Sequence, residues 1–378
     1  MSFISSAGKK GLEAGIEGRR YDIDWLRNGA ILLLFPYHTS RVFDYWDPFY
    51  AKSEELSWTL SYFIAIASIW FMPLLFWLAG SSSWFALGSR SGKSYMKERV
   101  MRLLVPLLTG LLLIIPPQGY YAMLTRGESP GPYIAYLGAF FTDFSDLSGY
   151  TGGFTPAHLW FLLYLFVFSL VLLPLFQSWR TDKAGLVLDK LSAIMSRPLP
   201  YLLLALPLSA LQLLPAPGGQ NPFYYMAIFT IGFLAVSHPR FQIMFTRYRK
   251  PYGLLAVLLS GLWTASFANG WLPHPILEMI RNAAMLLALA SLLGVGHARL
   301  NKRNKLLAYM NEAAFPVYVI HQTVIVVLSY YAVQWGFPLY VSFALILISS
   351  LVLSVAIYEV VLRKLAVTRL LFGIKKRQ

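Results

Sequence analysis

The feature that most constrains this chain is a series of apolar stretches, each long enough to cross a lipid bilayer as an α-helix. A hydrocarbon core about 30 Å thick needs about 20 mostly apolar residues. Such stretches lie near residues 25–43, 57–80, 103–124, 156–176, 200–216, 222–237, 252–270, 276–298, 312–332 and 337–361. Only 13% of the 378 residues are charged, whereas soluble domains have about 25%. The sequence therefore predicts an all-α, polytopic transmembrane bundle of about ten helices.

The loops between these stretches predict how the chain is oriented. Cytoplasmic loops of membrane proteins carry an excess of Lys and Arg, and here every second loop is basic. We therefore expect both termini in the cytoplasm, with tails at 1–22 and 365–378 and a transmembrane domain at 23–364. The net charge of +15 is spread over these loops, and without a basic domain it does not indicate nucleic-acid binding.

Two segments are less regular than the rest. The fifth and sixth stretches are expected to be short, kinked or re-entrant, because they are crowded by Pro207, Pro215, Pro217 and Pro222. The longest predicted external segment, 118–155, is rich in Gly, Pro, Tyr and Ser, and is a candidate lid over an external site.

Several kinds of chemistry are excluded or unsupported. The chain has no cysteine, so disulfides, zinc–thiolate sites, iron–sulfur clusters and thiol nucleophiles are excluded. It has no P-loop, no GxGxxG before a helix and no nucleophile elbow, and we expect no metal site. Candidate catalytic groups must therefore be ionisable residues within the apolar stretches.

Arg27 and His38 are the first candidates. The eleven steps between them make three helical turns plus about 20°, so both side chains lie on one helix face, about 16 Å apart along the axis. An ionisable group inside such a helix costs about 2.5–3.5 kcal/mol, which suggests a function. An anionic ligand held at Arg27 near the cytoplasm would present its far end to His38. Alternatively, Arg27 extends to the membrane surface and His38 hydrogen-bonds a neighbouring helix.

Two further histidines are candidates for the wall of a site. His321 lies about halfway along the ninth stretch, in the segment that begins at Tyr318, and a polar side chain at this depth should face the bundle interior. His158 and Trp160 lie at the external end of the fourth stretch, where aromatic residues of the membrane interface are equally expected.

The other charged candidates each have a possible partner close in the sequence. Asp24 lies one turn before Arg27 and is expected to orient its guanidinium. Arg281 either pairs with Glu278 or lines an entrance for a sugar. Glu359 either forms an ion pair at a helix end or orients a ligand. A basic run suits phosphate binding but also fits the predicted topology; it includes Arg90, Arg99 and Arg102.

These residues resemble the signature of the acyltransferase-3 family of membrane acyltransferases. Arg27 and His38, with ten residues between them, are similar to its first-helix motif, and the resemblance continues in register over nearly the whole chain. The other matching residues are Gly80, Arg90, Arg99, Arg102, Pro106, His158 to Leu162, Gly296, His297, Asn311, Tyr318 to His321, Tyr358, Glu359, Arg363, Leu371 and Phe372. The later motifs especially resemble the branch with the periplasmic glucan succinyltransferase, the OpgC-like proteins.

The resemblance implies a ten-helix acyltransferase domain in the bacterial inner membrane. Acyl-CoA, carrying an acetyl or succinyl group, would enter from the cytosol, and the hydroxyl acceptor, an envelope glycan or another molecule, from the periplasm. His38 would be catalytic as a general base, while Arg27, with Arg90, Arg99 and Arg102, would hold the coenzyme A phosphates. The residues expected to contact or support the substrates are Asp24, His158, Trp160, Arg281, Tyr318, His321 and Glu359.

Two other functions fit the same sequence. A transporter or flippase for an envelope saccharide or small solute also has broken helices and polar residues near the midplane. A non-catalytic subunit of an envelope polysaccharide machine would use these residues for folding and partner contacts. The sequence leaves open the acyl group, the acceptor, direct transfer against an acyl-histidine intermediate, and the oligomeric state, with a homodimer among the possibilities.

Overall fold

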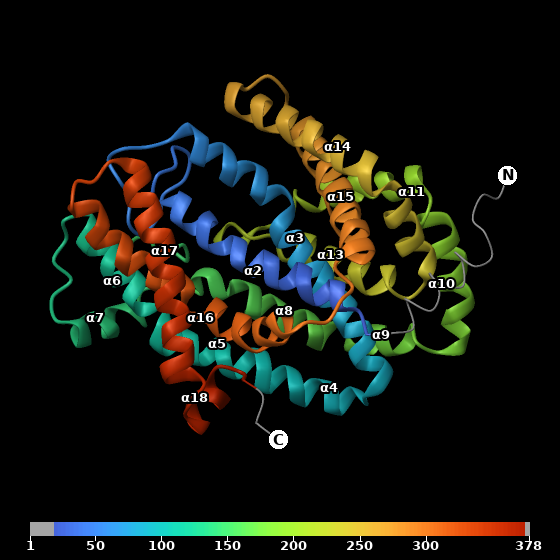
Figure 1. The fold of residues 1–378 in the computed structure, drawn as a ribbon, viewed down its shortest axis with the longest axis horizontal. Helices are drawn as coiled ribbons and strands as arrows, with labels where there is room; N and C mark the ends of the chain where they lie inside the picture. The colour runs from blue at the N-terminus through green and yellow to red at the C-terminus, as the bar shows by residue number, and fades with distance from the viewer. Residues whose placement is uncertain (1–18, 375–378) are drawn as a thin grey trace.

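The computed structural model describes residues 19–374, which form helices joined by loops (Figure 1). Residues 1–18 of the predicted N-terminal tail lie outside these described residues. The predicted C-terminal tail is described as far as residue 374 and contains a short helix, α18 (Ala366–Leu371). The longer helices are α2 (Tyr21–Arg41), α3 (Trp58–Ser89), α8 (Trp160–Val171), α10 (Asp182–Met195), α13 (Pro222–Ala235), α14 (Pro239–Asn269), α15 (His274–Arg299), α16 (Lys305–Gln334) and α17 (Leu339–Ile357). The shorter ones are α7 (Tyr133–Phe140), α9 (Leu173–Ser178), α11 (Pro198–Leu203), α12 (Ala205–Leu211) and α18.

One further long segment, Gly92–Thr125, alternates between α-helix and π-helix. It consists of α4 (Gly92–Arg99), η1 (Val100–Leu104), α5 (Val105–Thr109), η2 (Gly110–Ile114) and α6 (Pro116–Thr125). Each π-helical turn comes just before a proline, Pro106 or Pro116. Proline cannot donate the usual backbone hydrogen bond, and a widened turn accommodates its ring without ending the helix.

The prediction of an all-α membrane bundle is confirmed for the described residues, but the count of ten spans is not. Each predicted apolar stretch contains helix, yet within residues 19–374 only six helical segments are long and apolar enough to cross a membrane. A seventh is possible if residues 184–195 and 198–211, bent by 96°, form one broken span. This bend lies at the start of the proline-rich region that we expected to be irregular. α2 carries Asp22, Asp24 and Arg27 in its first turns, which makes it less apolar than the others.

One helix boundary differs clearly from the expectation. α14 begins at Pro239, whereas the apolar stretch was placed at 252–270 because the preceding residues are basic. The helix continues through Pro251, so the basic residues are the first turns of the same helix rather than a loop.

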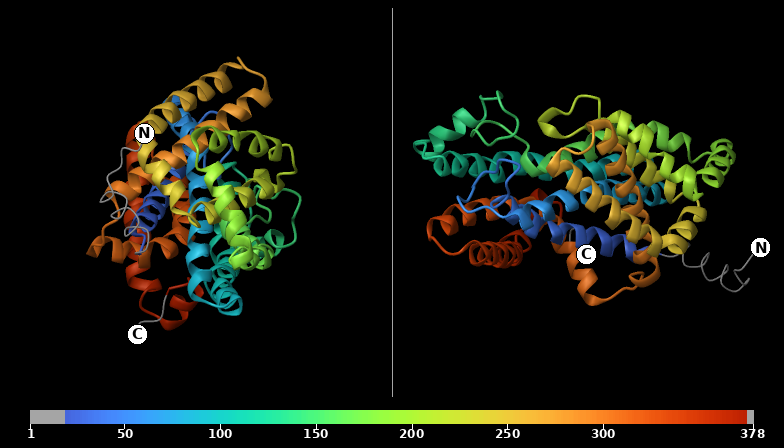
Figure 2. Two further views of the ribbon diagram at one scale, coloured as in Figure 1. Left: turned by 90° about the vertical axis from the view of Figure 1, so that its right-hand side faces the viewer. Right: turned by 90° about the horizontal axis from the view of Figure 1, so that it is seen from above.

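α2 is the central helix of the bundle. It packs against α3, α15, α16 and α17 and runs through the middle of the view in Figure 1. Two further views show helices from the first and last parts of the chain side by side around it (Figure 2). A residue on α2 can therefore reach side chains from both halves of the sequence.

Close backbone contact fixes α3 against α13. A Cβ atom at Gly80 would overlap the backbone of Phe229, and one at Gly232 would overlap the backbone of Trp77. Only glycine allows this approach. The contact places aromatic residues of α13 beside the start of α8, where the candidate site lies.

Candidate functional site

Three histidines that are far apart in the sequence meet inside the bundle. The ring of His321, on α16, lies 5.2 Å from that of His38 on α2 and 5.0 Å from that of His158, measured between centroids. His158 belongs to η3 (Ala157–Leu159), just before α8. His158 and His321 are buried, whereas His38 keeps part of its surface exposed.

Backbone carbonyls of α16 orient two of these histidines. His158 Nε2 lies 2.9 Å from the Val319 carbonyl oxygen, and His321 Nδ1 lies 2.5 Å from that of Tyr318. The Tyr318 hydroxyl in turn donates to the His158 carbonyl at 2.5 Å. Tyr318 and His158 thus join α16 to the start of α8 by reciprocal bonds.

The turn before His158 is strained. Ala157 has a φ of 41°, a left-handed conformation that costs a residue with a Cβ about 1–2 kcal/mol. The Thr155 hydroxyl accepts a hydrogen bond from the Ala157 amide at 2.9 Å, which holds this turn. Such strain is commonly found at functional sites, and here it sets the direction of the His158 side chain.

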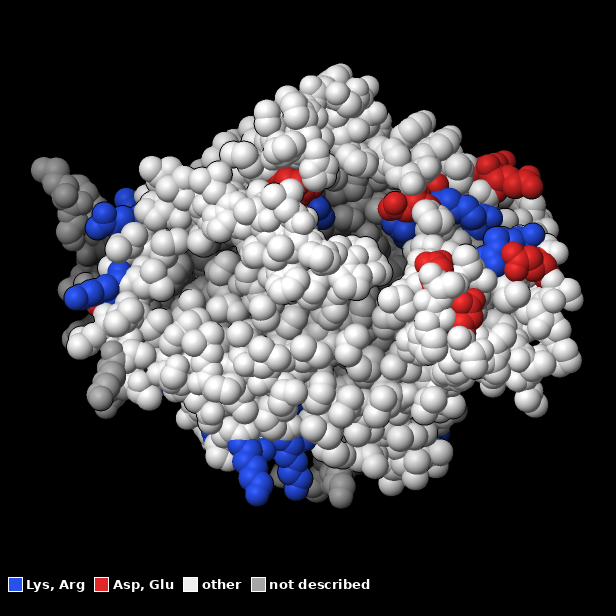
Figure 3. Space-filling model, turned by 180° about the vertical axis from the view of Figure 1, so that it is seen from behind, with Lys and Arg blue, Asp and Glu red and all other residues white. Residues whose placement is uncertain are grey.

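His38 and His158 line a cavity of about 520 Å³. Its walls come from the end of α2, the start of α8, parts of α3, α13, α15 and α16, and three loops. Trp160, Tyr318 and Arg281, all predicted site residues, also line it. The loop residues include Leu147, Ser148, Tyr150 and Thr155, from the segment predicted to be a lid. One face of the molecule is hollowed and has charged residues gathered beside the hollow (Figure 3).

The cavity wall combines aromatic rings with neutral polar groups. The aromatic side chains are Tyr37, Phe49, Tyr50, Phe71, Tyr150, Trp160, Tyr164, Tyr224, Tyr225 and Tyr318. The neutral polar side chains are Ser68, Ser148, Thr155, Gln212, Gln220, Asn221 and Gln322. Burial raises the pKa of the loop phenols Tyr50 and Tyr150, so both remain neutral near pH 7 and can donate hydrogen bonds.

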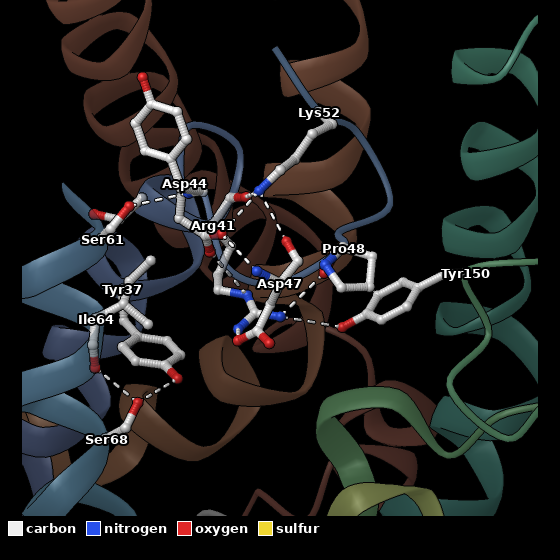
Figure 4. Close-up of polar contacts among 12 residues, drawn as sticks. Tyr37, Arg41, Asp44, Asp47, Pro48, Lys52, Ser61, Ile64, Ser68 and Tyr150 are labelled. Carbon is white, nitrogen blue, oxygen red and sulfur yellow. Dashed lines mark hydrogen bonds and ion pairs between the residues drawn. The ribbon is translucent and has the colours of Figure 1, made fainter. Parts of the chain in front are cut away.

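Arg41, which the sequence did not identify as a site residue, lies on the cavity wall one turn after His38. Its guanidinium contacts Asp47 at 2.6 Å and Asp44 at 3.6 Å and donates to the Pro48 carbonyl at 3.0 Å. Tyr150 accepts a bond from it at 3.5 Å (Figure 4). Lys52 donates to Asp44 at 2.9 Å, and burial lowers its pKa despite this carboxylate. Two cations thus face two carboxylates at the end of α2 and in the loop after it, and the bond from Arg41 to Tyr150 joins this loop to the loop at Tyr150.

Arg281 enters the cavity from α15. It contacts Glu278, three residues earlier, at 3.5 Å, and lies over the ring of Trp263 at 5.8 Å from its centroid. The two alternatives from the sequence are therefore compatible, because Arg281 pairs with Glu278 and also lines the cavity.

The predicted phosphate-binding arginines lie together at the other end of α2. Arg102 lies close enough to Arg27, Arg90 and Arg99 for their positive charges to repel its own. Arg90 and Arg102 share the carboxylate of Glu98. Arg99 has no carboxylate partner among the described residues and lies over the Tyr95 ring at 4.5 Å. These arginines do not line the cavity that contains His38.

Asp24 and Glu359 form the pairs that their spacing suggested. Asp24 contacts Arg27 and accepts a hydrogen bond from Asn311 of α16 at 3.2 Å. Glu359, in the π-helical segment η5 (Tyr358–Leu362), contacts Arg363 at 2.8 Å. Neither carboxylate lines the cavity.

A bundle of apolar helices around a polar cavity, lined by His38 and His158, defines a multi-pass membrane protein with an internal cavity. The model of the acyltransferase domain of the acyltransferase-3 family matches residues 20–359. The chain therefore belongs to this family, as the motifs of α2 and α8 indicated, and membership supports a transferase activity.

Several similar curated proteins share one name. Glucans biosynthesis protein C from Salmonella schwarzengrund (strain CVM19633) and from Salmonella typhi are each 25% identical to this chain, covering 91% of it and 92% of their own length. The protein of that name from Salmonella paratyphi A (strain ATCC 9150 / SARB42) is 24% identical over the same shares. No solved structure matches the chain significantly.

Proposed function

We propose that this protein is a membrane O-acyltransferase that moves an acetyl or succinyl group from cytoplasmic acyl-CoA to a hydroxyl of an envelope carbohydrate. The main observation in support is the position of His38, a partly exposed imidazole on a polar cavity inside an acyltransferase-family bundle. The name of the similar Salmonella proteins suggests a glucan as the acceptor.

In the proposed reaction, neutral His38 acts as the general base. It takes the proton of the acceptor hydroxyl as the oxygen attacks the thioester carbon, and an oxyanion forms on the former carbonyl oxygen. The carbon–sulfur bond then breaks, coenzyme A thiolate leaves, and the proton on His38 passes to the sulfur. A positioned base of this kind contributes about 10²–10⁴-fold to the rate. Attack by His38 itself, through an acyl-histidine, is the alternative route.

The cavity suits a saccharide acceptor. Sugar rings have apolar faces that pack on aromatic side chains and hydroxyls that need neutral polar partners, and ligand pockets generally combine the two. Trp160 and Tyr225 lie next to each other on the wall, with ring centroids 5.1 Å apart. Gln220, on the loop before α13, supplies an amide group, whereas the amide of Asn221 is used in capping α13 and in bonds to backbone carbonyls. We place the acceptor on this wall, with one hydroxyl at His38.

The arginines near the start of α2 suit the donor. Arg guanidiniums bind phosphate oxygens in pairs, and coenzyme A carries several phosphate groups. The rise of α2 from Arg27 to His38 is about 16 Å, so phosphates held at Arg27 would leave the pantetheine arm to span this distance. We propose that the donor lies along α2 with its thioester at His38.

Purified protein in nanodiscs, given acetyl- or succinyl-CoA with or without a β-glucan, tests the proposal. Coenzyme A release that depends on the glucan, with acyl groups recovered on the glucan, is the expected result. Movement of intact saccharide into vesicles without coenzyme A release would favour the transporter. Neither reaction, from folded protein supplied with both donors, would favour the non-catalytic subunit.

A further inference from the structure

The three histidines differ in which of their ring nitrogens have a hydrogen-bond partner. His158 and His321 each use one nitrogen on a backbone carbonyl. The remaining nitrogens, Nδ1 of His158 and Nε2 of His321, are buried without a hydrogen-bond partner among the described residues. Nδ1 of His38 is also buried without a partner in this part of the chain. Buried ring nitrogens are normally paired, so three in one cluster require an explanation.

The carbonyl bonds determine the tautomers of two rings. A carbonyl oxygen only accepts, so His321 must carry its proton on Nδ1 and His158 must carry its proton on Nε2. When neutral, each then presents a bare acceptor nitrogen, and the two cannot bond one another. The proton of His38 is the only ring proton in the cluster that is not already used.

His321 is placed to accept that proton. Two imidazoles joined by an N–H···N bond of about 2.9 Å have ring centroids about 5 Å apart, and the rings of His38 and His321 are 5.2 Å apart with planes inclined at 51°. The outer torsion of a histidine side chain is soft, so the rings can turn about it while their centroids stay at this separation. No close ring contact joins His38 to His158 in the described structure.

We propose that His321 is a positioning residue for His38: its Nε2 accepts the Nδ1 proton of His38 and so directs the Nε2 lone pair of His38 into the cavity. This inference rests on the proposed function, in which that lone pair is the base. A histidine's partner on one nitrogen commonly sets the tautomer of the other. When His38 takes up a proton, the Nδ1 bond becomes charge-assisted and stronger, which stabilises the cation formed in the reaction.

A matched pair of substitutions separates this role from simple packing. In His321→Gln the amide oxygen can occupy the place of Nε2 and accept from His38. In His321→Asn the shorter side chain can keep the bond to the Tyr318 carbonyl but cannot reach His38. We expect His321→Asn to lower kcat about 10–100-fold with KM for both substrates nearly unchanged, and His321→Gln to recover most of this loss. Equal kcat values for the two variants would overturn the proposal.

The tautomer of His38 can be measured without turnover. Nitrogen-15 NMR of histidine-labelled protein in nanodiscs, with His38 assigned from its loss in His38→Ala, distinguishes the Nδ1–H from the Nε2–H form. We expect Nδ1–H in the wild type and a mixture in His321→Asn. A dominant Nε2–H form in the wild type would overturn the inference even if acyl transfer occurs. The Nδ1–H form in a protein without transferase activity would instead refute the proposed function alone.

Discussion

Replacing His38 with alanine separates catalysis from stability. The imidazole makes no hydrogen bond to the described residues and is partly exposed on the cavity. Its contacts are with rings, among them Tyr37 at 5.3 Å and Phe49 at 6.2 Å between centroids. Removing it breaks no hydrogen bond that the structure shows, but it takes from His321 Nε2 the donor proposed above, and we expect a loss of about 1–3 kcal/mol in the free energy of unfolding.

The expected effect on the reaction is much larger. Loss of a general base lowers the rate by about 10²–10⁴-fold, which corresponds to about 2.7–5.5 kcal/mol in the activation free energy. The assay is glucan-dependent coenzyme A release in nanodiscs, with thermal unfolding measured on the same samples. His274→Ala is the matched control, because His274 is an exposed histidine at the start of α15 and does not line the cavity.

Two results would refute this reasoning. Activity of His38→Ala within about twofold of the control, against the loss expected for a base, would remove His38 from the mechanism. A fall in unfolding temperature as large as that of a core substitution would show that the ring is structural, and the lost activity would then say nothing about catalysis.

Three other substitutions test the donor end, the acceptor wall and the helix packing. Arg27→Ala should raise KM for acyl-CoA about tenfold with little change in kcat, because phosphate contacts contribute uniform binding; steady-state kinetics at varied donor will show this, and an unchanged KM counts against the clamp. Trp160→Ala should raise KM for the glucan about 3–10-fold, the range of an aromatic contact, and leave KM for the donor unchanged in the same assay. Gly80→Ala should destabilise the protein by about 1–3 kcal/mol, because its Cβ would overlap the Phe229 backbone. Gly29→Ala, where a Cβ meets nothing within 4 Å, is the control in thermal unfolding, and equal stability of the two variants would contradict the packing argument.

The helices could be predicted from the sequence because the length of an apolar stretch is read directly from consecutive residues. The number of membrane spans could not be predicted, because some helices are long but polar and others are apolar but short. α2 is deeply packed but polar at its start, and α13 has only 14 residues. Such helices are stabilised by their neighbours in the bundle, which no local measure of hydropathy records.

Part of the site could be predicted because polar residues inside apolar helices are costly and must face a partner. This argument identified His321 and His38, and the structure places their rings together. It did not identify Arg41, whose partners Asp47 and Tyr150 lie on loops that meet only in the folded chain. Arg41 lies three residues after His38 and so on the same helix face. This spacing could have indicated that the two side chains share one site.

The distribution of residues along α2 bears on how the two substrates would be kept apart. Arg27 and Asp24 lie near its start and His38 and Arg41 near its end, whereas the residues between them include the buried Ala30, Ile31 and Leu34. On the proposed function, the charged coenzyme A and the sugar would each stay at its own end of the helix. Only a slender arm would need to pass the apolar middle, where ions and water are poorly solvated. A polar substitution at Ile31 should therefore weaken this barrier to ions before it affects the chemistry at His38.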